Sequence, residues 1–389
     1  MKFASSMSRL GTESAFEVLA KAKALEAQGK EIIHLEIGEP DFDTPQHIIN
    51  AACEALRSGA THYTPSAGIM ELREAIAEDI NAKRGYRVKP EQVVVTPGAK
   101  PIMFYTILAL GEPGREIIYP NPGFPIYESM INYVGAKAVP VPLREERGFR
   151  FDVNELLDLI TDRTALIILN SPQNPTGGML EEGDLEAIAE VCVRRDIPVL
   201  SDEVYEHILY DGEFASIASY PGMSPSERTI ILHGFSKTYA MTGWRLGYGI
   251  MPEDMAAAVT RLMTNSNSCT NAATQYAGIA ALKGSQDSVA KMVAAFRERR
   301  DVIVEGLNSL PGITCVKPRG AFYVFPNITG TGMSSKKFEA FAMDEAGVAC
   351  LSGAAFGEYG EGYLRMSYAN SVENISKAID RIGEALKRR

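Results

Sequence analysis

Between residues 90 and 250, short runs rich in β-branched and aliphatic residues alternate with longer stretches of helical periodicity. The runs lie at 92–95, 116–119, 165–169, 198–200 and 229–232. This alternation is typical of β/α units on a mostly parallel sheet that helices cover on both faces. We therefore predict an α/β fold built on a large, doubly covered, mostly parallel sheet.

Several of these runs end in small or polar residues. The ends lie at 96–98, 170–172, 201–203 and 233–234. Ligands of open α/β sheets bind at the carboxyl ends of the strands. We therefore expect the four segments to converge on one site.

The chain has 389 residues, which is too many for one small core, so we expect two domains. After Pro252 the pattern becomes helical, and an amphipathic stretch over 287–310 is interpreted as the connector to a second domain. The remaining elements predicted there are a strand at 321–325 and helices at 14–28, 334–346 and 372–387. We predict a large domain over 48–285 and a smaller α/β domain formed by 1–47 and 286–389.

The net charge of the chain restricts its binding partners, and its cysteines indicate its compartment. Thirty-nine Lys and Arg against 49 Asp and Glu give a net charge of −10, which disfavours binding to nucleic acid and to anionic membranes. We find no signal peptide, no apolar run long enough to span a bilayer, and no metal site. The five cysteines form no C-x-x-C pair, so we expect reduced thiols and a cytoplasmic protein.

Lys237 follows the last of the strand-like runs, in the segment GFSKTYAMTGWRLG at 234–247. An amine placed just after a strand, among small residues, can reach a ligand lying across the strand ends, and partial desolvation lowers its pKa toward nucleophilicity. A single lysine is more often a solvated surface residue. The whole segment, however, resembles the cofactor-lysine signature of class I aminotransferases of the aspartate aminotransferase superfamily, in which the lysine binds pyridoxal 5′-phosphate covalently.

The resemblance extends from about Gly38 to Arg365, with the motifs in the family's order. It implies the fold-type I architecture of pyridoxal-phosphate enzymes, with a large and a smaller α/β domain. It also implies an aminotransferase that moves an amino group from an L-amino acid to a 2-oxo acid. In such an enzyme Lys237 is the catalytic residue that moves the proton from the substrate's Cα, first as a base and then as an acid.

The resemblance assigns a phosphate site to Arg245 and to the turn of Gly98, Ala99 and Lys100, with Ser236 beside the cofactor lysine. A planar, permanently charged guanidinium suits a dianionic group, and the N-terminus of a helix after a small-residue turn favours an anion. For Arg245 alone, a structural ion pair is the alternative.

Four further residues correspond to those around the cofactor ring. Asp202 resembles the aspartate that keeps the ring nitrogen protonated, so that the ring can accept electrons. Tyr205 and Asn174 match the donors to the ring's phenolate oxygen, although the Asn-Pro-Thr-Gly segment is also an ordinary turn. Phe124 takes the place of the aromatic residue that stacks on the ring, where relatives carry Trp or Tyr; a core phenylalanine is the alternative.

The substrate's α-carboxylate is assigned by resemblance to Arg365, with Gly38 and Asn174 nearby. A bidentate Arg–carboxylate pair fixes the substrate's orientation. Tyr63 resembles the tyrosine that reaches the phosphate of the neighbouring subunit's cofactor, which implies a homodimer with shared active sites. A tyrosine in an ordinary loop is the alternative.

Lys100 also bears on the choice of substrate. In related enzymes with a similar phosphate turn, this lysine faces the side-chain carboxylate of a dicarboxylic substrate, so aspartate and glutamate are favoured here. A solvated lysine is the alternative. The N-terminal loop at 9–14 does not match aspartate-specific relatives closely, and Glu13 would repel an acidic side chain if it pointed inward.

Other functions remain open from the sequence. Aromatic, alanine or prephenate-type substrates fit the same motifs, and so does a pyridoxal-phosphate-dependent lyase on this scaffold. A regulatory ligand-binding module is disfavoured because no basic helix-turn-helix extension precedes residue 30. A nicotinamide dehydrogenase is disfavoured because its G-x-G-x-x-G fingerprint is missing.

Overall fold

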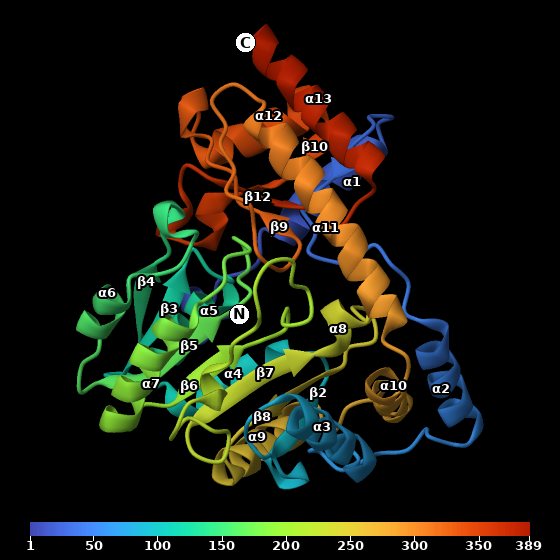
Figure 1. Ribbon diagram of the computed structural model, residues 1–389, viewed down its shortest axis with the longest axis vertical. Helices are drawn as coiled ribbons and strands as arrows, with labels where there is room; N and C mark the ends of the chain where they lie inside the picture. Colours follow the sequence, from blue (N-terminus) through green and yellow to red (C-terminus); the bar gives the residue numbers. More distant parts are fainter.

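A computed structural model describes all residues from Met1 to Arg389. Its largest element is a seven-stranded sheet in the order β2-β8-β7-β6-β5-β3-β4, in the lower half of Figure 1. Its strands are β2 Val93–Thr96, β3 Glu116–Asn121, β4 Lys137–Pro142, β5 Thr164–Asn170, β6 Val199–Asp202, β7 Thr229–Gly234 and β8 Gly247–Ile250. The strands from β7 to β4 pair in parallel, and β8 runs antiparallel to both of its neighbours. The predicted α/β fold class is confirmed.

Both faces of this sheet are buried, which explains the continuous apolar runs. Along β2, Val93 and Val95 pack into one hydrophobic cluster and Val94 packs into another. The surrounding helices are α2 Gln46–Arg57, α3 Met70–Lys83, α4 Lys100–Leu110, α5 Ile126–Val134, α6 Val153–Asp158, α7 Glu182–Arg195, α8 Phe235–Thr238, α9 Glu253–Ser266 and α10 Ala272–Lys283.

The upper part of Figure 1 contains elements from both ends of the chain. Its strands β11 Leu351–Ser352, β12 Leu364–Ser367 and β9 Tyr323–Val324 form one antiparallel sheet, and β1 Ile33–His34 pairs in parallel with β10 Val348–Ala349. Its helices are α1 Ala15–Glu26, α11 Asp287–Asn308, α12 Ser335–Ala346 and α13 Val372–Arg388.

The four helices predicted in this part are therefore confirmed, within a few residues at each end. The strand expected over 321–325 is shorter, because Ala321 has a positive φ of 58° and only Tyr323–Val324 pairs as β9. In Figure 1 the long helix α11 runs from this part down toward the large sheet, as a connector would. The boundaries at 47/48 and 285/286 stay a prediction. No helix is both long enough and apolar enough to cross a membrane.

The turn before α4 packs directly against β8. A Cβ on Gly247 would lie 2.3 Å from the backbone nitrogen of Ala99 and 2.4 Å from the carbonyl carbon of Gly98. These are backbone atoms, so neither can move aside without displacing the turn. Gly247 therefore sets how closely the edge of the sheet approaches this turn.

We predict that Gly247→Ala lowers the stability of the protein by about 1–3 kcal/mol, because the added methyl overpacks a backbone contact. Thermal unfolding of the variant should have a clearly lower midpoint. The matched control is Gly183→Ala in α7, where nothing lies within 4 Å of the new Cβ. There the midpoint should stay constant or rise, since alanine favours helix. Equal midpoints for both variants would contradict the packing argument.

Candidate active site

A cavity of about 370 Å³ lies at the carboxyl ends of β5, β6 and β7, between the large sheet and the upper part of the molecule. All of the predicted site residues except Gly98 and Tyr63 line it. Those lining residues are Gly38, Ala99, Lys100, Phe124, Asn174, Asp202, Tyr205, Ser236, Lys237, Arg245 and Arg365. Three of the four strand ends expected to converge contribute to the lining, through Asn170, Asp202 and Gly234; the segment 96–98 does not, although Ala99 directly after it does.

Lys237 lies on the short helix α8, directly after β7. Its Nζ donates a hydrogen bond to the carbonyl oxygen of Gly38 at 2.6 Å. Burial lowers the pKa of this amine to about 8, and the positive charges of Arg365 and Arg245 act in the same direction. Near physiological pH roughly a tenth to a fifth of the amine is therefore neutral and nucleophilic, far more than for an ordinary lysine with a pKa of about 10.4.

Asp202 ends β6 and is only 8% exposed. Its Oδ2 accepts a hydrogen bond from the hydroxyl of Tyr127 at 2.5 Å, and the Asn170 amide donates to its backbone carbonyl at 3.1 Å. Burial raises the pKa of Asp202 to about 6, although the hydrogen bond from Tyr127 opposes this shift. The result is a fixed carboxylate that faces the cavity and that a cationic partner would keep ionised.

Gly98 and Arg245 form a cradle at the start of α4. Gly98 has a φ of +85°, and a Cβ there would lie 2.2 Å from Nη2 of Arg245. The guanidinium donates to the carbonyl oxygen of Thr242 at 2.8 Å, and the side chain is otherwise exposed. Helix α4 has no side-chain N-cap. Pro101 has no N–H and the Ile102 amide donates to the Ala99 carbonyl, so the N–H groups left beside the guanidinium are those of Ala99 and Lys100. This is the donor set that binds an anion.

Arg365, in β12, is 5% exposed and is held from several sides. Its Nη1 donates to Asn174 Oδ1 at 3.3 Å and its Nη2 to the carbonyl oxygen of Glu36 at 2.5 Å. The rings of Tyr323 and Phe356 lie 4.6 and 4.9 Å from the guanidinium carbon. The Nε atom is buried and has no hydrogen-bond partner in the protein. This rigid group can therefore still donate to a carboxylate.

The sequence did not point to Tyr323 and Tyr127 as site residues. The Tyr323 hydroxyl lies 2.8 Å from the Tyr205 hydroxyl, and a Cβ on Gly38 would lie 2.1 Å from the same Tyr323 oxygen. Gly38 is thus required by a neighbouring tyrosine. Tyr323 belongs to the predicted strand at 321–325, but nothing in its local pattern told which side chain would face the cavity.

Phe124 and Tyr63 lie in different surroundings. The Phe124 ring lines the cavity, edge-on to Tyr127 at 5.7 Å between centroids, and Lys100 Nζ lies 5.3 Å from its centre. Tyr63 is 89% exposed and lies outside the cavity of its own chain.

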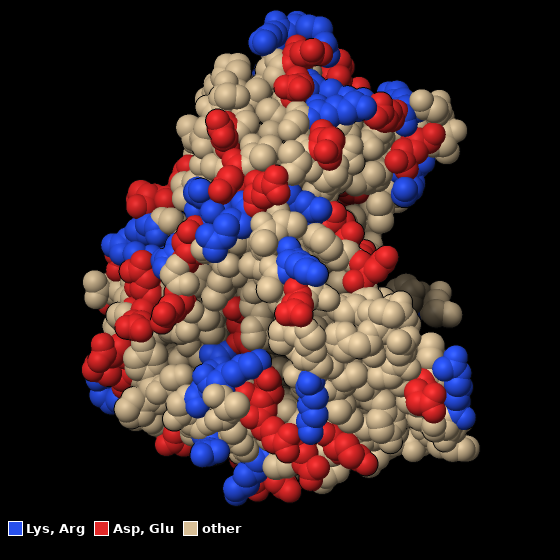
Figure 2. All heavy atoms as spheres, turned by 45° about the vertical axis from the view of Figure 1, so that its right-hand side comes forward, with Lys and Arg blue, Asp and Glu red and all other residues tan.

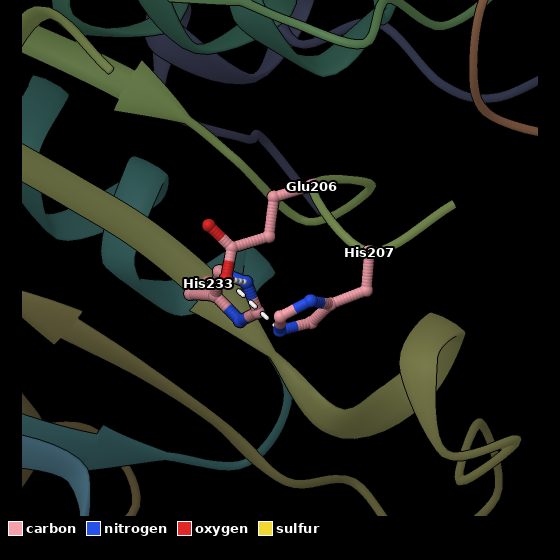
Figure 3. Close-up of side chains that lie close together, drawn as sticks. All are labelled: Glu206, His207 and His233. Carbon is pink, nitrogen blue, oxygen red and sulfur yellow. Dashed lines mark ion pairs between the residues drawn. The ribbon is translucent and has the colours of Figure 1, made fainter. Parts of the chain in front are cut away.

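A second cluster of titratable side chains, Glu206, His207 and His233, lies outside the cavity, and Figure 3 shows their polar ends pointing toward one another. The Nε2 atoms of His207 and His233 lie 3.1 and 3.0 Å from one Glu206 oxygen. The Gly234 amide donates to Nδ1 of His233, so the other ring nitrogen, Nε2, carries the proton. A metal would need the lone pair of that nitrogen.

Arg84 already forms an ion pair with Glu206 and another, at 3.1 Å, with Glu203. Glu203 follows Asp202 directly, and Gly234 follows His233. We therefore interpret the cluster as a buried charge network behind the ends of β6 and β7 rather than as a metal site.

Comparisons with known proteins agree with this geometry. The family described as "Aminotransferase class I and II" matches residues 30–382. A probable aspartate/prephenate aminotransferase of Aquifex aeolicus is 43% identical over 99% of this chain and 98% of its own. Aromatic-amino-acid aminotransferase 2 of Thermococcus litoralis is 44% identical over 93% of each chain.

Solved structures give the same result. The aspartate aminotransferase of Thermus thermophilus with maleate superposes with a TM-score of 0.94 at 36% identity, covering 99% of this chain and 100% of its own. An alanine aminotransferase of Pyrococcus furiosus has a TM-score of 0.94 at 35% identity and covers 100% of both chains. This chain therefore belongs to the class I and II aminotransferase family and is an aminotransferase of fold type I.

Proposed function

We propose that this aminotransferase uses pyridoxal 5′-phosphate, bound covalently by Lys237, to move an amino group between an L-amino acid and a 2-oxo acid. The proposal rests on one observation: an amine of lowered pKa, a buried carboxylate and two guanidinium groups line a single cavity. These belong to Lys237, Asp202, Arg245 and Arg365. Aspartate and glutamate are the favoured amino donors.

The residues present fit this cofactor. The close approach of Arg245 to Gly98, at a free helix N-terminus, is suited to a phosphate, with Ala99, Lys100 and Ser236 around it. Asp202 would hold the ring nitrogen protonated, since a cation next to a buried carboxylate keeps both groups charged. Phe124 would stack on the ring, while Tyr205 and Asn174 would donate to its phenolate oxygen.

The cofactor, when bound, supplies an electrophilic carbon and an electron-accepting ring. The protein supplies orientation and proton transfer. Arg365, with Gly38 and Asn174, would bind the substrate's α-carboxylate and so set the position of the Cα–H bond. Lys237, once displaced by the substrate's amine, would accept the Cα proton as a base and then donate a proton as an acid. Its lowered pKa suits both of these roles near neutral pH.

We also propose a cytoplasmic homodimer with shared active sites. Tyr63 is free to reach a neighbouring subunit's phosphate, because it lies on the surface, 89% exposed. Leu56 and Tyr276 add exposed apolar area, and a broad region without charged side chains lies in the lower right of Figure 2.

The proposed cytoplasmic location is supported by the cysteines. All five are unpaired, as suits a reducing compartment.

Replacing Lys237 tests the cofactor proposal. Lys237→Ala should leave the fold intact and remove the covalent attachment. The one other amine in the cavity, that of Lys100, is paired with Glu13. After borohydride reduction of the cofactor-loaded protein, peptide mass spectrometry should find the phosphopyridoxyl group on Lys237 in the wild type and nowhere in the variant. Lys283→Ala, an exposed position, is the control. Full labelling of another lysine in the Lys237→Ala protein would refute the assignment.

The pKa of Lys237 gives a prediction about pH. Only the neutral amine reacts with acetic anhydride, and the neutral fraction rises as the pH passes upward through the pKa. In the cofactor-free protein, acetylation of Lys237 should have its midpoint near pH 8, whereas ordinary lysines titrate near 10.4. Competitive labelling followed by mass spectrometry measures both in one sample. A Lys237 midpoint at or above 10 would contradict the burial argument.

Arg365 tests the proposed carboxylate site. Arg365→Lys keeps the charge but loses the planar fork, so kcat/KM for amino acids should fall by roughly 30-fold or more, a loss of about 2 kcal/mol or greater. The control is Arg195→Lys, at an exposed ion pair on α7, which should change kcat/KM little. Unchanged kcat/KM in Arg365→Lys would exclude a direct contact with substrate.

A further inference from the structure

Glu13 and Lys100 form an ion pair that lies within the cavity wall. Glu13 Oε1 is paired with Lys100 Nζ, and both residues line the cavity. The Glu13 side chain is 19% exposed and that of Lys100 is 45% exposed, so the pair is only partly screened by water. Glu13 lies two residues before α1, next to its N-cap Ser14, while Lys100 begins α4. The N-terminal segment therefore supplies a carboxylate to a lysine of the large sheet's site.

The rest of this wall contains apolar groups. Phe16 lies one helical turn beyond Glu13, is 64% exposed, and lines the same cavity as Met103 and Ile37. The Lys100 amine also lies 5.3 Å from the centre of the Phe124 ring, where its charge meets an aromatic face. With the ion pair formed, the wall offers apolar surface and a neutralised charge pair.

We propose that Glu13 is a specificity-determining residue that occupies Lys100 as an internal carboxylate. A substrate with an acidic side chain must displace Glu13 before its own carboxylate can pair with Lys100. A substrate with an uncharged side chain, aromatic or aliphatic, leaves the pair intact and packs on the apolar wall. The ion pair thereby lowers the preference for aspartate and glutamate and lets one site accept both classes.

This inference rests on the proposed function and predicts the direction of a change in specificity. Glu13→Gln removes the carboxylate that competes for Lys100 while keeping the shape of the side chain. The gain for acidic substrates should be on the order of five- to tenfold, as expected for a partly exposed charge pair. The gain requires Lys100, so it should vanish in a Glu13→Gln, Lys100→Met double variant.

The test uses cofactor-loaded enzyme in the half-reaction, without an acceptor, so that no second acidic substrate confuses the result. The rate of oxo acid release is measured at several concentrations of aspartate and of phenylalanine. For each amino acid it gives the rate constant of the half-reaction divided by the dissociation constant of that substrate. Binding of maleate and of 3-phenylpropionate, measured by calorimetry, gives a readout independent of turnover. The matched control is Glu17→Gln, one turn further along α1, which removes an exposed charge outside the cavity.

Glu13→Gln should raise the aspartate value and tighten maleate binding on the order of five- to tenfold, with phenylalanine and 3-phenylpropionate changed by less than about twofold. Glu17→Gln should change neither class. An aspartate gain that persists without Lys100, equal gains for both classes, or no gain at all would overturn the role of Glu13 and leave the proposed aminotransferase chemistry standing. Failure of the wild-type enzyme to release oxo acid from either amino acid would overturn both proposals.

Discussion

Two neighbouring parallel strands, β6 and β7, end in register, and the geometry of the whole site depends on this pairing. Asp202 pairs with Leu232, and the Glu203 amide donates to the Leu232 carbonyl at 2.9 Å. Strand β7 ends two residues after Leu232, at Gly234, and the next residue begins α8, which carries Lys237. The backbone ladder thus fixes the carboxylate of one strand beside the amine carried by the next. The ion pairs of Arg84 with Glu203 and Glu206 join the segment after β6 to the end of α3, and all three side chains are 10% exposed or less.

The charges that line the cavity differ from the net charge of the whole protein. The chain carries a net charge of −10, but the cavity is lined by four cationic side chains, Lys237, Arg245, Arg365 and Lys100, and by only three carboxylates, Glu13, Glu39 and Asp202. Burial is the main reason that the pKa of Lys237 is low, and the positive charges of Arg365 and Arg245 lower it further. Because Lys100 is paired with Glu13, the cations that remain for an anionic ligand are Lys237, Arg245 and Arg365, and such a ligand would relieve the repulsion among them.

The sequence allowed the strands of the central sheet to be predicted where both faces are buried, because short runs rich in β-branched residues, such as that of β5, favour a buried strand. It did not reveal β4, which contains two prolines on a sheet edge, or β8, where two of the four residues are glycine. Motifs placed Lys237 and Arg245 at the site because their neighbours in the chain are distinctive. Tyr127 and Tyr323 reach the site only through tertiary packing. No local pattern could have identified their partners, which are the Asp202 carboxylate for Tyr127 and the Tyr205 hydroxyl for Tyr323.

The pairing of β1 with β10 joins Ile33 to Val348, and the cavity needs both Gly38 from one end of the chain and Arg365 from the other. During synthesis β1 therefore has no strand to pair with until β10, near the end of the chain, has left the ribosome. The central strands can form their sheet earlier, with the amine of Lys237 already in place. The cavity wall that carries Arg365 is then added last, so the cavity of a growing chain stays incomplete until synthesis is nearly finished.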